Sequence, residues 1–265
     1  MTQTIDSETK QIIDELHKGT KFPIDLNRII QAEGNIRTRP ANYGEKFNGR
    51  IEYIRDRKIF ILYHPAVITA RTRFSIAHEL GHFYISEHRN LLLAGKSHNS
   101  KSGFISDKRL EREADEFASY LLVPQSHLKK LLWQKTFLTL KDLLELSNQL
   151  QVSATAMAVR YVRMTPEPCA IILSQDGQQK FYWPSDEMEC RGFKWRGCRS
   201  IPSNSATSEA AKNQGSGQVF ENKKETDSSV WFSNRQRECE IWEEAFPLGY
   251  TGLVLTMLSD TSYNG

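Results

Sequence analysis

The stretch RTRFSIAHELGH, residues 71–82, lies in a segment whose apolar residues point to every side of a helix. We expect a helix over residues 69–86, and a helix that is apolar all round is a buried one. The polar side chains of His78, Glu79 and His82 would then be buried as well. Burying them without partners costs several kcal/mol, so the stretch predicts a site that satisfies them.

A metal ion would satisfy these residues. His78 and His82 are four positions apart, about 40° around a helix axis, so both imidazoles can reach one ion. Zinc accepts neutral imidazole and prefers tetrahedral geometry. Glu79 is turned about 100° from His78, beside the ion, where a general base can take a proton from water. We predict a zinc site on His78 and His82, with manganese as the alternative ion and Glu79 as the catalytic residue.

A catalytic zinc ion needs a third protein ligand, and His88 is one candidate. The number of residues between His82 and His88 matches the pattern HExxHxxGxxH. That pattern needs glycine at its midpoint, where the chain turns sharply, and this chain has Ile85 there. The other interpretation of His88 is a solvated residue just past the end of the helix.

Glu111 is the second candidate, on a helix expected over residues 108–123. Glu111 and Asp115 share one face at i,i+4, so Glu111 can bind the metal while Asp115 accepts a hydrogen bond from a ligand histidine. Glu113 points away from this pair and is the weaker choice.

Gly81 costs the first helix about 1 kcal/mol relative to alanine, so we expect another element to pack closely against it.

Two stretches together, residues 71–82 and EREADEFASYLLVP at residues 111–124, resemble the ImmA/IrrE family of metallopeptidases. The family pattern is an RxRFxxAHELGH helix, then ExxA(N/D)xFA and a closing LLxP. This chain has Asp115 where Asn is usual and Val123 where Met is usual, and neither change removes a ligand. The resemblance covers about residues 20–165.

The resemblance implies an α+β fold, with a zincin-like metalloprotease domain of the gluzincin type whose active-site helix lies beside a small β-sheet. It implies that His78, His82 and Glu111 are the metal ligands and that Glu79 is the general base. Asp115 would accept a hydrogen bond from a ligand histidine. It also implies a zinc endopeptidase that cuts a partner protein, a helix-turn-helix (XRE-type) transcriptional repressor, and so induces stress-response or mobile-element genes.

Shorter elements surround the motif. We expect helices near residues 12–16 and 24–31, and a hairpin of strands at residues 50–55 and 58–63. The second strand of the hairpin is the expected sheet edge, along which an extended substrate would pair. Residues 90–106 are polar and are expected to form a loop.

A helix-turn-helix-like pair is expected at residues 140–163, with Ser153 as the second helix's N-cap. This pair offers the competing function, a DNA-binding transcriptional regulator with a structural metal site. The second helix carries Ala, Thr, Met and Val with one cation, Arg160, whereas a helix that reads bases presents Arg, Lys, Asn or Gln. Packing against another element, or docking the repressor, fits this surface better, so direct nucleic-acid binding is not expected.

The chain changes character at Pro166–Pro168. Residues 1–165 are predicted to form the peptidase domain, and residues 166–265 a mainly β region for regulation or recognition. A hairpin is expected from residue 169 to residue 183, with further strands at 230–233 and 253–258. The Ser- and Gly-rich stretch at residues 202–229 is expected to be a flexible loop.

Composition excludes few function classes. The 265 residues are 39% hydrophobic and 25% charged, with a net charge of +3, so no broad basic surface indicates nucleic acid or membrane. No apolar run approaches the roughly 18 residues of a membrane span, and the polar N-terminus indicates the cytoplasm. None of the four cysteines forms a CxxC pair.

The sequence does not single out the residue that would stabilise the oxyanion. Four residues are candidates: Arg71, Tyr84, His98 and Tyr161.

Overall fold

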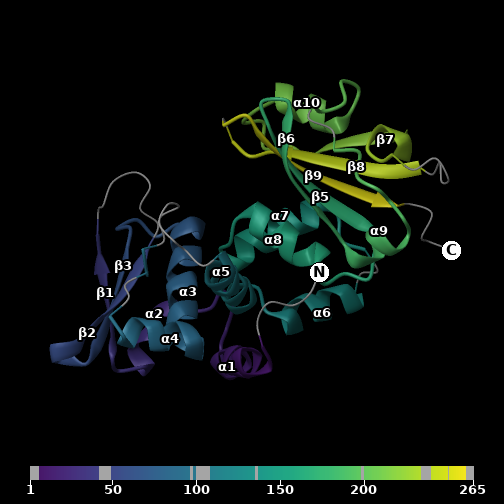
Figure 1. Cartoon of the computed structure of the whole chain (residues 1–265). Helices are drawn as coiled ribbons and strands as arrows, with labels where there is room; N and C mark the ends of the chain where they lie inside the picture. Colours follow the sequence, from purple (N-terminus) through teal and green to yellow (C-terminus); the bar gives the residue numbers. More distant parts are fainter. Residues whose placement is uncertain are drawn as a thin grey trace. The chain divides into compact units, whose positions relative to one another are not determined.

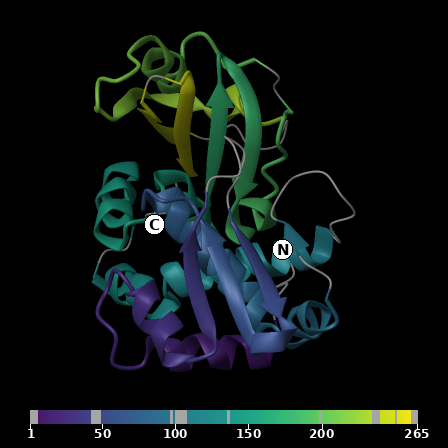
Figure 2. The ribbon, with the colours of Figure 1, turned by 90° about the vertical axis from the view of Figure 1, so that its left-hand side faces the viewer.

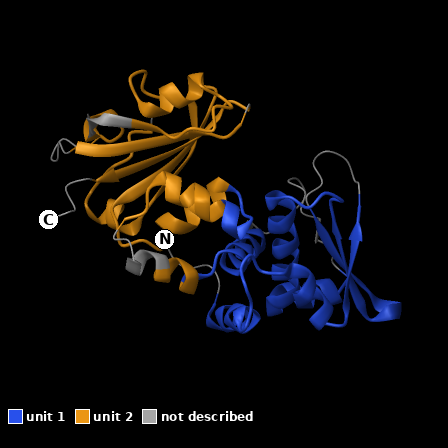
Figure 3. Cartoon of the chain, turned by 180° about the vertical axis from the view of Figure 1, so that it is seen from behind, with its two compact units in different colours: residues 1–125, 148–153 blue, residues 126–147, 154–265 orange. Residues whose placement is uncertain are grey.

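The computed structural model describes residues 6–41, 49–95, 98–99, 108–134, 137–197, 200–233, 240–249 and 251–260. The chain forms two compact units, residues 1–125 with 148–153 (unit 1) and residues 126–147 with 154–265 (unit 2), as Figure 3 shows. Each unit combines helices with one sheet, so the α+β class is confirmed. No junction between the units falls at residue 165, and the independent folding of residues 1–165 stays a prediction. Among the described helices, none has the length and apolar character to cross a membrane.

Unit 1 holds the predicted metal helix. Its elements in chain order are α1 (Ser7–His17), α2 (Leu26–Ala32), β1 (Ile36–Pro40), β2 (Arg50–Ile54), the 3-10 turn η1 (Arg55–Arg57), β3 (Ile59–His64), α3 (Ala70–Tyr84), α4 (Ser86–Leu93), β4 (His98–Asn99) and α5 (Lys108–Leu122).

The sheet of unit 1 has the order β1-β3-β2-β4, and only the β1–β3 pair is parallel. The predicted hairpin of β2 and β3 is confirmed. The prediction that residues 58–63 form a sheet edge is wrong, because β1 pairs with the free side of β3 from Ile36↔Phe60 to Pro40↔His64. The sequence IRTRP hides this strand, since a mostly exposed edge strand carries charges and a proline without penalty.

Helix α3 lies between the sheet and α5 (Figures 1 and 2) and contacts both. Its N-cap Thr69 accepts a hydrogen bond from the backbone N–H of Thr72 at 3.2 Å. A Cβ added to Gly81 would stand 3.2 Å from Ala114 Cα and from Phe117 Cβ. The expected close packing at Gly81 is therefore confirmed, and α5 is the element that makes it.

Helix α3 ends at Tyr84, and α4 begins two residues later. Ile85 joins them with φ −70° and ψ 118°, an ordinary extended conformation that needs no glycine. The prediction of a loop from residue 90 is wrong for residues 90–93, which continue α4. The rest of that stretch lies outside the described residues, apart from 94–95 and the short strand β4.

Unit 2 contains a second sheet with helices on its faces. Its elements are α6 (Gln125–Gln134), α7 (Leu140–Leu150), α8 (Ala154–Val162), β5 (Cys169–Gln175), β6 (Gln178–Pro184), α9 (Asp186–Cys190), α10 (Ala206–Lys212), β7 (Phe220–Asp227), the 3-10 turn η2 (Ser228–Val230), β8 (Glu240–Pro247) and β9 (Leu253–Asp260). The predicted helices α7 and α8, the β5–β6 hairpin and strand β9 occur near their expected positions.

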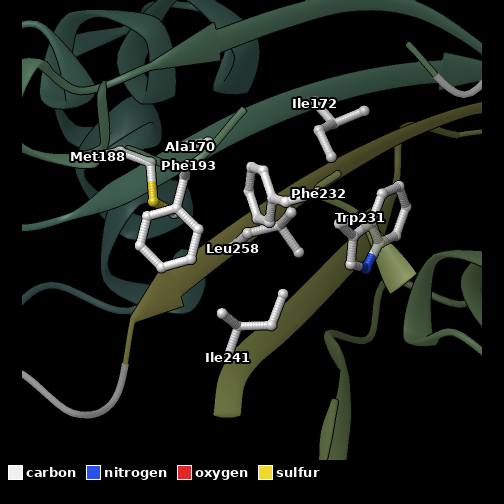
Figure 4. Close-up of a cluster of buried hydrophobic side chains, with 8 residues drawn as sticks. All are labelled: Ala170, Ile172, Met188, Phe193, Trp231, Phe232, Ile241 and Leu258. Atoms are coloured by element: carbon white, nitrogen blue, oxygen red, sulfur yellow. The ribbon is translucent and has the colours of Figure 1, made fainter. Parts of the chain in front are cut away.

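This second sheet is antiparallel throughout, in the order β6-β5-β9-β8-β7. One face carries a buried cluster in which Phe193, Trp231 and Phe232 lie over strand residues such as Ile172 and Leu258 (Figure 4). Successive side chains of a strand point to opposite faces, so the neighbours of these strand residues face the other side. There α8 contacts β5.

Two predictions for unit 2 are wrong. Residues 202–229 do not form one flexible loop, because α10 and β7 lie within them. Ser205 caps α10, and Ala206 and Ala210, one turn apart, pack on the sheet, while β7 is polar because it is an edge strand. Residues 230–233 form no strand, since η2 ends at Val230 and only an isolated bridge to Trp195 follows.

Two adjacent carboxylates of β8 hold helices to the sheet. Glu243 accepts hydrogen bonds from the backbone N–H and hydroxyl of Thr207 on α10, at 2.9 and 2.7 Å. Glu244 accepts from the backbone N–H of Leu140, the first residue of α7, at 3.1 Å to each oxygen. Burial raises the pKa of Glu244; the Leu140 N–H opposes this, nearby carboxylates add to it, and the result is about 7.

We predict that Glu244→Gln removes part of the pH dependence of unit 2's stability. Because the folded pKa lies above the ordinary value, the wild type loses stability as pH rises from about 4.5 to about 7, by about 3 kcal/mol at most. An amide still accepts from Leu140 but does not ionise. All five tryptophans lie in unit 2, so urea unfolding followed by tryptophan fluorescence at pH 5 and pH 8 measures the difference.

Glu209→Gln, which changes an exposed carboxylate on α10, is the control and should keep the wild-type pH dependence. An equal loss of stability between pH 5 and pH 8 in the wild type and in Glu244→Gln would contradict the prediction.

Candidate metal centre

Three predicted ligand residues come together between α3 and α5. His78 Nε2 lies 3.1 Å from His82 Nε2. Glu111 reaches the same place from α5, with one carboxylate oxygen 3.4 Å from His78 Nε2 and the other 3.6 Å from His82 Nε2. Both histidines are buried, and Glu111 is partly exposed. Two buried imidazole nitrogens and a partly exposed carboxylate therefore converge on one point.

These atoms are close enough for one ion to bind all three residues. Ligand atoms at about 2.0–2.1 Å from a tetrahedral zinc ion lie roughly 3.3–3.4 Å from one another. The two Nε2 atoms are 3.1 Å apart, and each has a different oxygen of Glu111 near it, at 3.4 Å from His78 and 3.6 Å from His82. One ligand atom from each of the three residues lies within 4.8 Å of the other two. The donor types, imidazole and carboxylate, are also those that zinc accepts. A zinc ion held by these three residues would have a fourth coordination position open.

Asp115 lies behind His78, one helical turn after Glu111. His78 Nδ1–H donates to Asp115 Oδ1 at 2.8 Å, and in the neutral imidazole this leaves the Nε2 lone pair directed at the ligand cluster. Burial lowers the pKa of His78, but hydrogen bonds to Asp115 and Glu111 and the charge of Glu79 outweigh it and raise the pKa to about 10. The same carboxylates that stabilise a proton here also stabilise a divalent cation.

Glu79 is fully buried beside the histidines. The backbone of Gly49, directly before β2, lies so close that an added Cβ would stand 3.1 Å from Glu79 Oε1. Sequence reasoning missed this residue, since a lone glycine before a strand carries no distinctive signal. Gly49 thus leaves room for the Glu79 carboxylate at the start of β2.

His88 is not a solvated residue past a helix end, as one prediction had it, because it is fully buried. Since Ile85 turns the chain in an extended conformation, α4 brings His88 back against α3. Its Nδ1 lies 3.1 Å from Nδ1 of His82, the ring nitrogen opposite the ligand cluster. His88 therefore lies behind His82 and is not the third ligand.

Glu113 is the next partner in this chain of contacts, another role that the sequence interpretation missed. His88 Nε2 lies 3.0 Å from Glu113 Oε2. Arg109 donates to the other Glu113 oxygen at 2.9 Å and to Glu87 Oε1 at 2.6 Å. The i,i+4 spacing of Arg109 and Glu113 was the available signal, since oppositely charged residues at that spacing pair on a helix.

The oxyanion candidates are not brought to the cluster as a group. Tyr84 donates its hydroxyl to Glu33 Oε1, Tyr161 belongs to unit 2 and accepts from Leu138 N–H at 3.4 Å, and the His98 side chain lies outside the described part of the structure. Arg71 is exposed at the start of α3. The structure assigns none of them to an oxyanion.

Comparison with known proteins finds a family for this part of the chain. The model of the Peptidase_M78 family, described as an IrrE N-terminal-like domain, matches residues 34–161. The matched range contains α3, α4 and α5 and so the whole cluster. No curated protein matches the sequence significantly.

A solved structure with a similar fold covers most of the chain. It is described as a Mycobacterium tuberculosis transcriptional regulator and has a TM-score of 0.64 and 13% sequence identity, over 97% of this chain and 77% of that one. At this identity the similarity concerns the fold, and it extends through both units.

We predict that the protein binds one divalent transition-metal ion and that Glu111→Gln weakens the binding. The amide keeps the shape of the side chain but loses the charge, so we expect more than the roughly 10–100-fold loss of affinity that a change behind a ligand causes. Chelator competition measures the affinity. Glu145→Gln, at an exposed position of α7, should bind as the wild type does, and equal affinities for all three proteins would remove Glu111 from the site.

Proposed function

Because the chain belongs to the Peptidase_M78 family through residues 34–161, we propose that it is a zinc-dependent endopeptidase that cuts a partner protein at a specific site. The observation that carries the proposal is the convergence of His78, His82 and Glu111 on one point. The buried Glu79 adjoins the first of these residues on the same helix. The family consists of metal-dependent peptidases, and a set of three ligands suits a catalytic zinc ion. Both support hydrolysis of a peptide bond as the reaction.

Glu79 is the proposed general base. When bound, zinc supplies Lewis acidity that polarises a peptide carbonyl and makes water more acidic. The Glu79 carboxylate accepts the proton of the attacking water and then delivers it to the nitrogen of the leaving amine. Burial of Glu79 against Gly49 fixes its position and limits its contact with bulk water. Asp115 holds His78 in the tautomer that a metal ligand requires.

The proposed substrate lies as an extended strand on the β4 side of the sheet. β3 is internal, so it cannot receive another strand. β4 is the edge strand next to β2, and it pairs with Arg50 and Ile51, directly after the glycine that lies against Glu79. Backbone hydrogen bonds along such an edge give affinity that depends little on sequence. Selectivity for one partner must then come from another surface, and unit 2 is the proposed source.

A helix-turn-helix repressor is the proposed partner. The resemblance of residues 71–82 and 111–124 to the ImmA/IrrE family supports this, since its members typically cut such repressors. The solved structure with the same fold is described as a transcriptional regulator, which agrees with a role in gene regulation. Cleavage of the repressor would release the genes that it silences.

DNA reading by the α7–α8 pair is less favoured than proteolysis. Arg160, the only cation within α8, is 2% exposed. The same helix buries Met157, Tyr161 and Val162 and contacts β5. A helix whose cation is inside the protein cannot present it to base edges or phosphates, so α8 has a packing role.

We predict that Glu79→Gln retains the bound metal and loses peptidase activity. The variant keeps the size of the side chain and removes its basicity, and general acid–base catalysis contributes typically 10²–10⁴-fold to a rate. Metal content by elemental analysis and kcat on a cleaved substrate measure both effects. Wild-type kcat in this variant would eliminate Glu79 as the base.

We also predict that a neighbouring gene encodes a helix-turn-helix repressor and that this protein cuts it. The zinc-loaded enzyme should make one or two cuts in the repressor and leave casein nearly intact, with Glu79→Gln and chelator-treated enzyme as inactive controls. Mass spectrometry of the products locates the cuts. Equal degradation of unrelated unfolded proteins would contradict the selectivity and leave the peptidase activity standing. A repressor left uncut, with tight duplex DNA binding that weakens steeply with salt, would favour the regulator.

A further inference from the structure

The two ligand histidines are supported in different ways. His78 donates from Nδ1 directly to a carboxylate, Asp115 Oδ1. Nδ1 of His82 lies 3.1 Å from Nδ1 of His88 instead. Both residues of this second contact are fully buried. A buried imidazole therefore takes the place of a carboxylate behind His82.

Proton positions along this second path follow from hydrogen-bond rules. Glu113 as a carboxylate only accepts, so the proton of a neutral His88 lies on Nε2, directed at Glu113 Oε2 3.0 Å away. Nδ1 of His88 then carries a lone pair and accepts the N–H of His82 Nδ1. The remaining nitrogen of His82, Nε2, has its lone pair directed toward His78 Nε2 and Glu111. The path from Glu113 through His88 thus selects the one neutral tautomer of His82 that can bind a metal through Nε2.

The reverse assignment would disable the site. If His88 carried its proton on Nδ1, that proton would point at Nδ1 of His82, and the His82 proton would move to Nε2. The Nε2 atom would then face the ligand cluster as a donor and could not bind a cation. Arg109 opposes this outcome, because it donates to Oε1 of Glu113 at 2.9 Å and so orients the carboxylate with Oε2 toward Nε2 of His88.

We propose that His88 is a positioning residue for the metal site, which fixes the tautomer and ring orientation of His82 and is itself fixed by Glu113. The inference rests on the proposed function, since it assigns His82 as a ligand. It adds a contact that the sequence pattern does not contain, because α4 delivers His88 from beyond the HELGH stretch. With this contact, three acidic residues of α5 serve the two histidines: Glu111 at the front, Asp115 behind His78 and Glu113 behind His88.

Two variants of His88 separate hydrogen bonding from packing. His88→Phe keeps an aromatic ring of similar volume but offers no acceptor to His82. His88→Asn removes most of the ring but places its amide oxygen where Nδ1 stands, since both atoms are bonded to Cγ. His17→Phe is the matched control: His17, on α1, has its Nε2 2.9 Å from the carbonyl oxygen of Leu121 and lies in the same unit.

We expect the zinc affinity of His88→Phe to fall roughly 10–100-fold, the usual loss when the partner of a ligand histidine is removed. His88→Asn should recover most of that loss, and His17→Phe should bind zinc as the wild type does. Chelator competition gives the affinities, and the visible spectrum of the cobalt-substituted protein should change in His88→Phe alone. Thermal unfolding of the metal-free proteins shows whether each variant is folded.

Nitrogen-15 NMR of histidine-labelled protein gives a readout that does not depend on activity. Seven histidines contribute signals, and the signal missing from His88→Asn identifies His88. The wild type should show His88 as the neutral tautomer protonated on Nε2. His88 protonated on Nδ1, or on both nitrogens, would overturn the proposal.

The zinc affinities of the wild type and the two His88 variants also test the positioning role of His88. If His88→Phe binds zinc as tightly as the wild type and His88→Asn binds worse, His88 acts through packing and the inference is wrong while the proposed function stands. A wild-type protein that binds no zinc would overturn the proposed function and the inference together. A folded His88→Phe with weakened zinc binding that His88→Asn restores supports the positioning role.

Discussion

The close approach of α3 to α5 at Gly81 is the contact on which the site depends. At this position the two helix backbones are so near that even a methyl group would stand 3.2 Å from Ala114 Cα. Short side chains can therefore span the gap, and an aspartate reaches His78 with a hydrogen bond of 2.8 Å. A wider separation would leave Glu111 and Asp115 too far from the histidines to act. The glycine thus lowers the helix propensity of α3 and allows the short distance between α3 and α5 that brings Glu111 and Asp115 to the histidines.

The charges in this narrow space explain why a cation suits it. Glu79, Glu111 and Asp115 all stabilise the protonated form of His78, enough to outweigh the effect of burial on its pKa. A group of carboxylates this close together repels itself unless a positive charge lies among them. Protonation of an imidazole supplies one such charge, and a divalent ion supplies two without disturbing the histidine tautomers. The acidic residues of α5 therefore favour the metal as well as contribute a ligand to it.

The parts that sequence analysis predicted are those fixed by local periodicity. His78, Glu79 and His82 share one helix, so their spacing defines their directions, and the i,i+4 pair of Glu111 and Asp115 is equally readable. The position of His88 does not follow from the sequence, because a β-branched Ile85 disfavours the sharp turn of the HExxHxxGxxH pattern. The chain returns through an extended residue and a new helix, and it reaches the opposite nitrogen of His82. Strand β1 and helix α10 were not predicted, because their residues are mostly small or polar. Such residues form a strand or a helix here only because each segment pairs with or packs on a sheet made by distant residues.

Adjacent residues of a strand point to opposite faces of its sheet, and Glu243 and Glu244 use this property to hold one helix on each side. The two layers of unit 2 are therefore tied to the same dipeptide of β8. Detaching α7 would take the Leu140 N–H from the buried Glu244. Detaching α10 would take both Thr207 donors from the buried Glu243 and leave it the Trp231 Nε1–H at 3.4 Å. Each loss is costly in a dry interior. Local opening of either layer is disfavoured for this reason, and the expected pattern of amide hydrogen exchange is one cooperative unit in which both helix N-termini lose protection together.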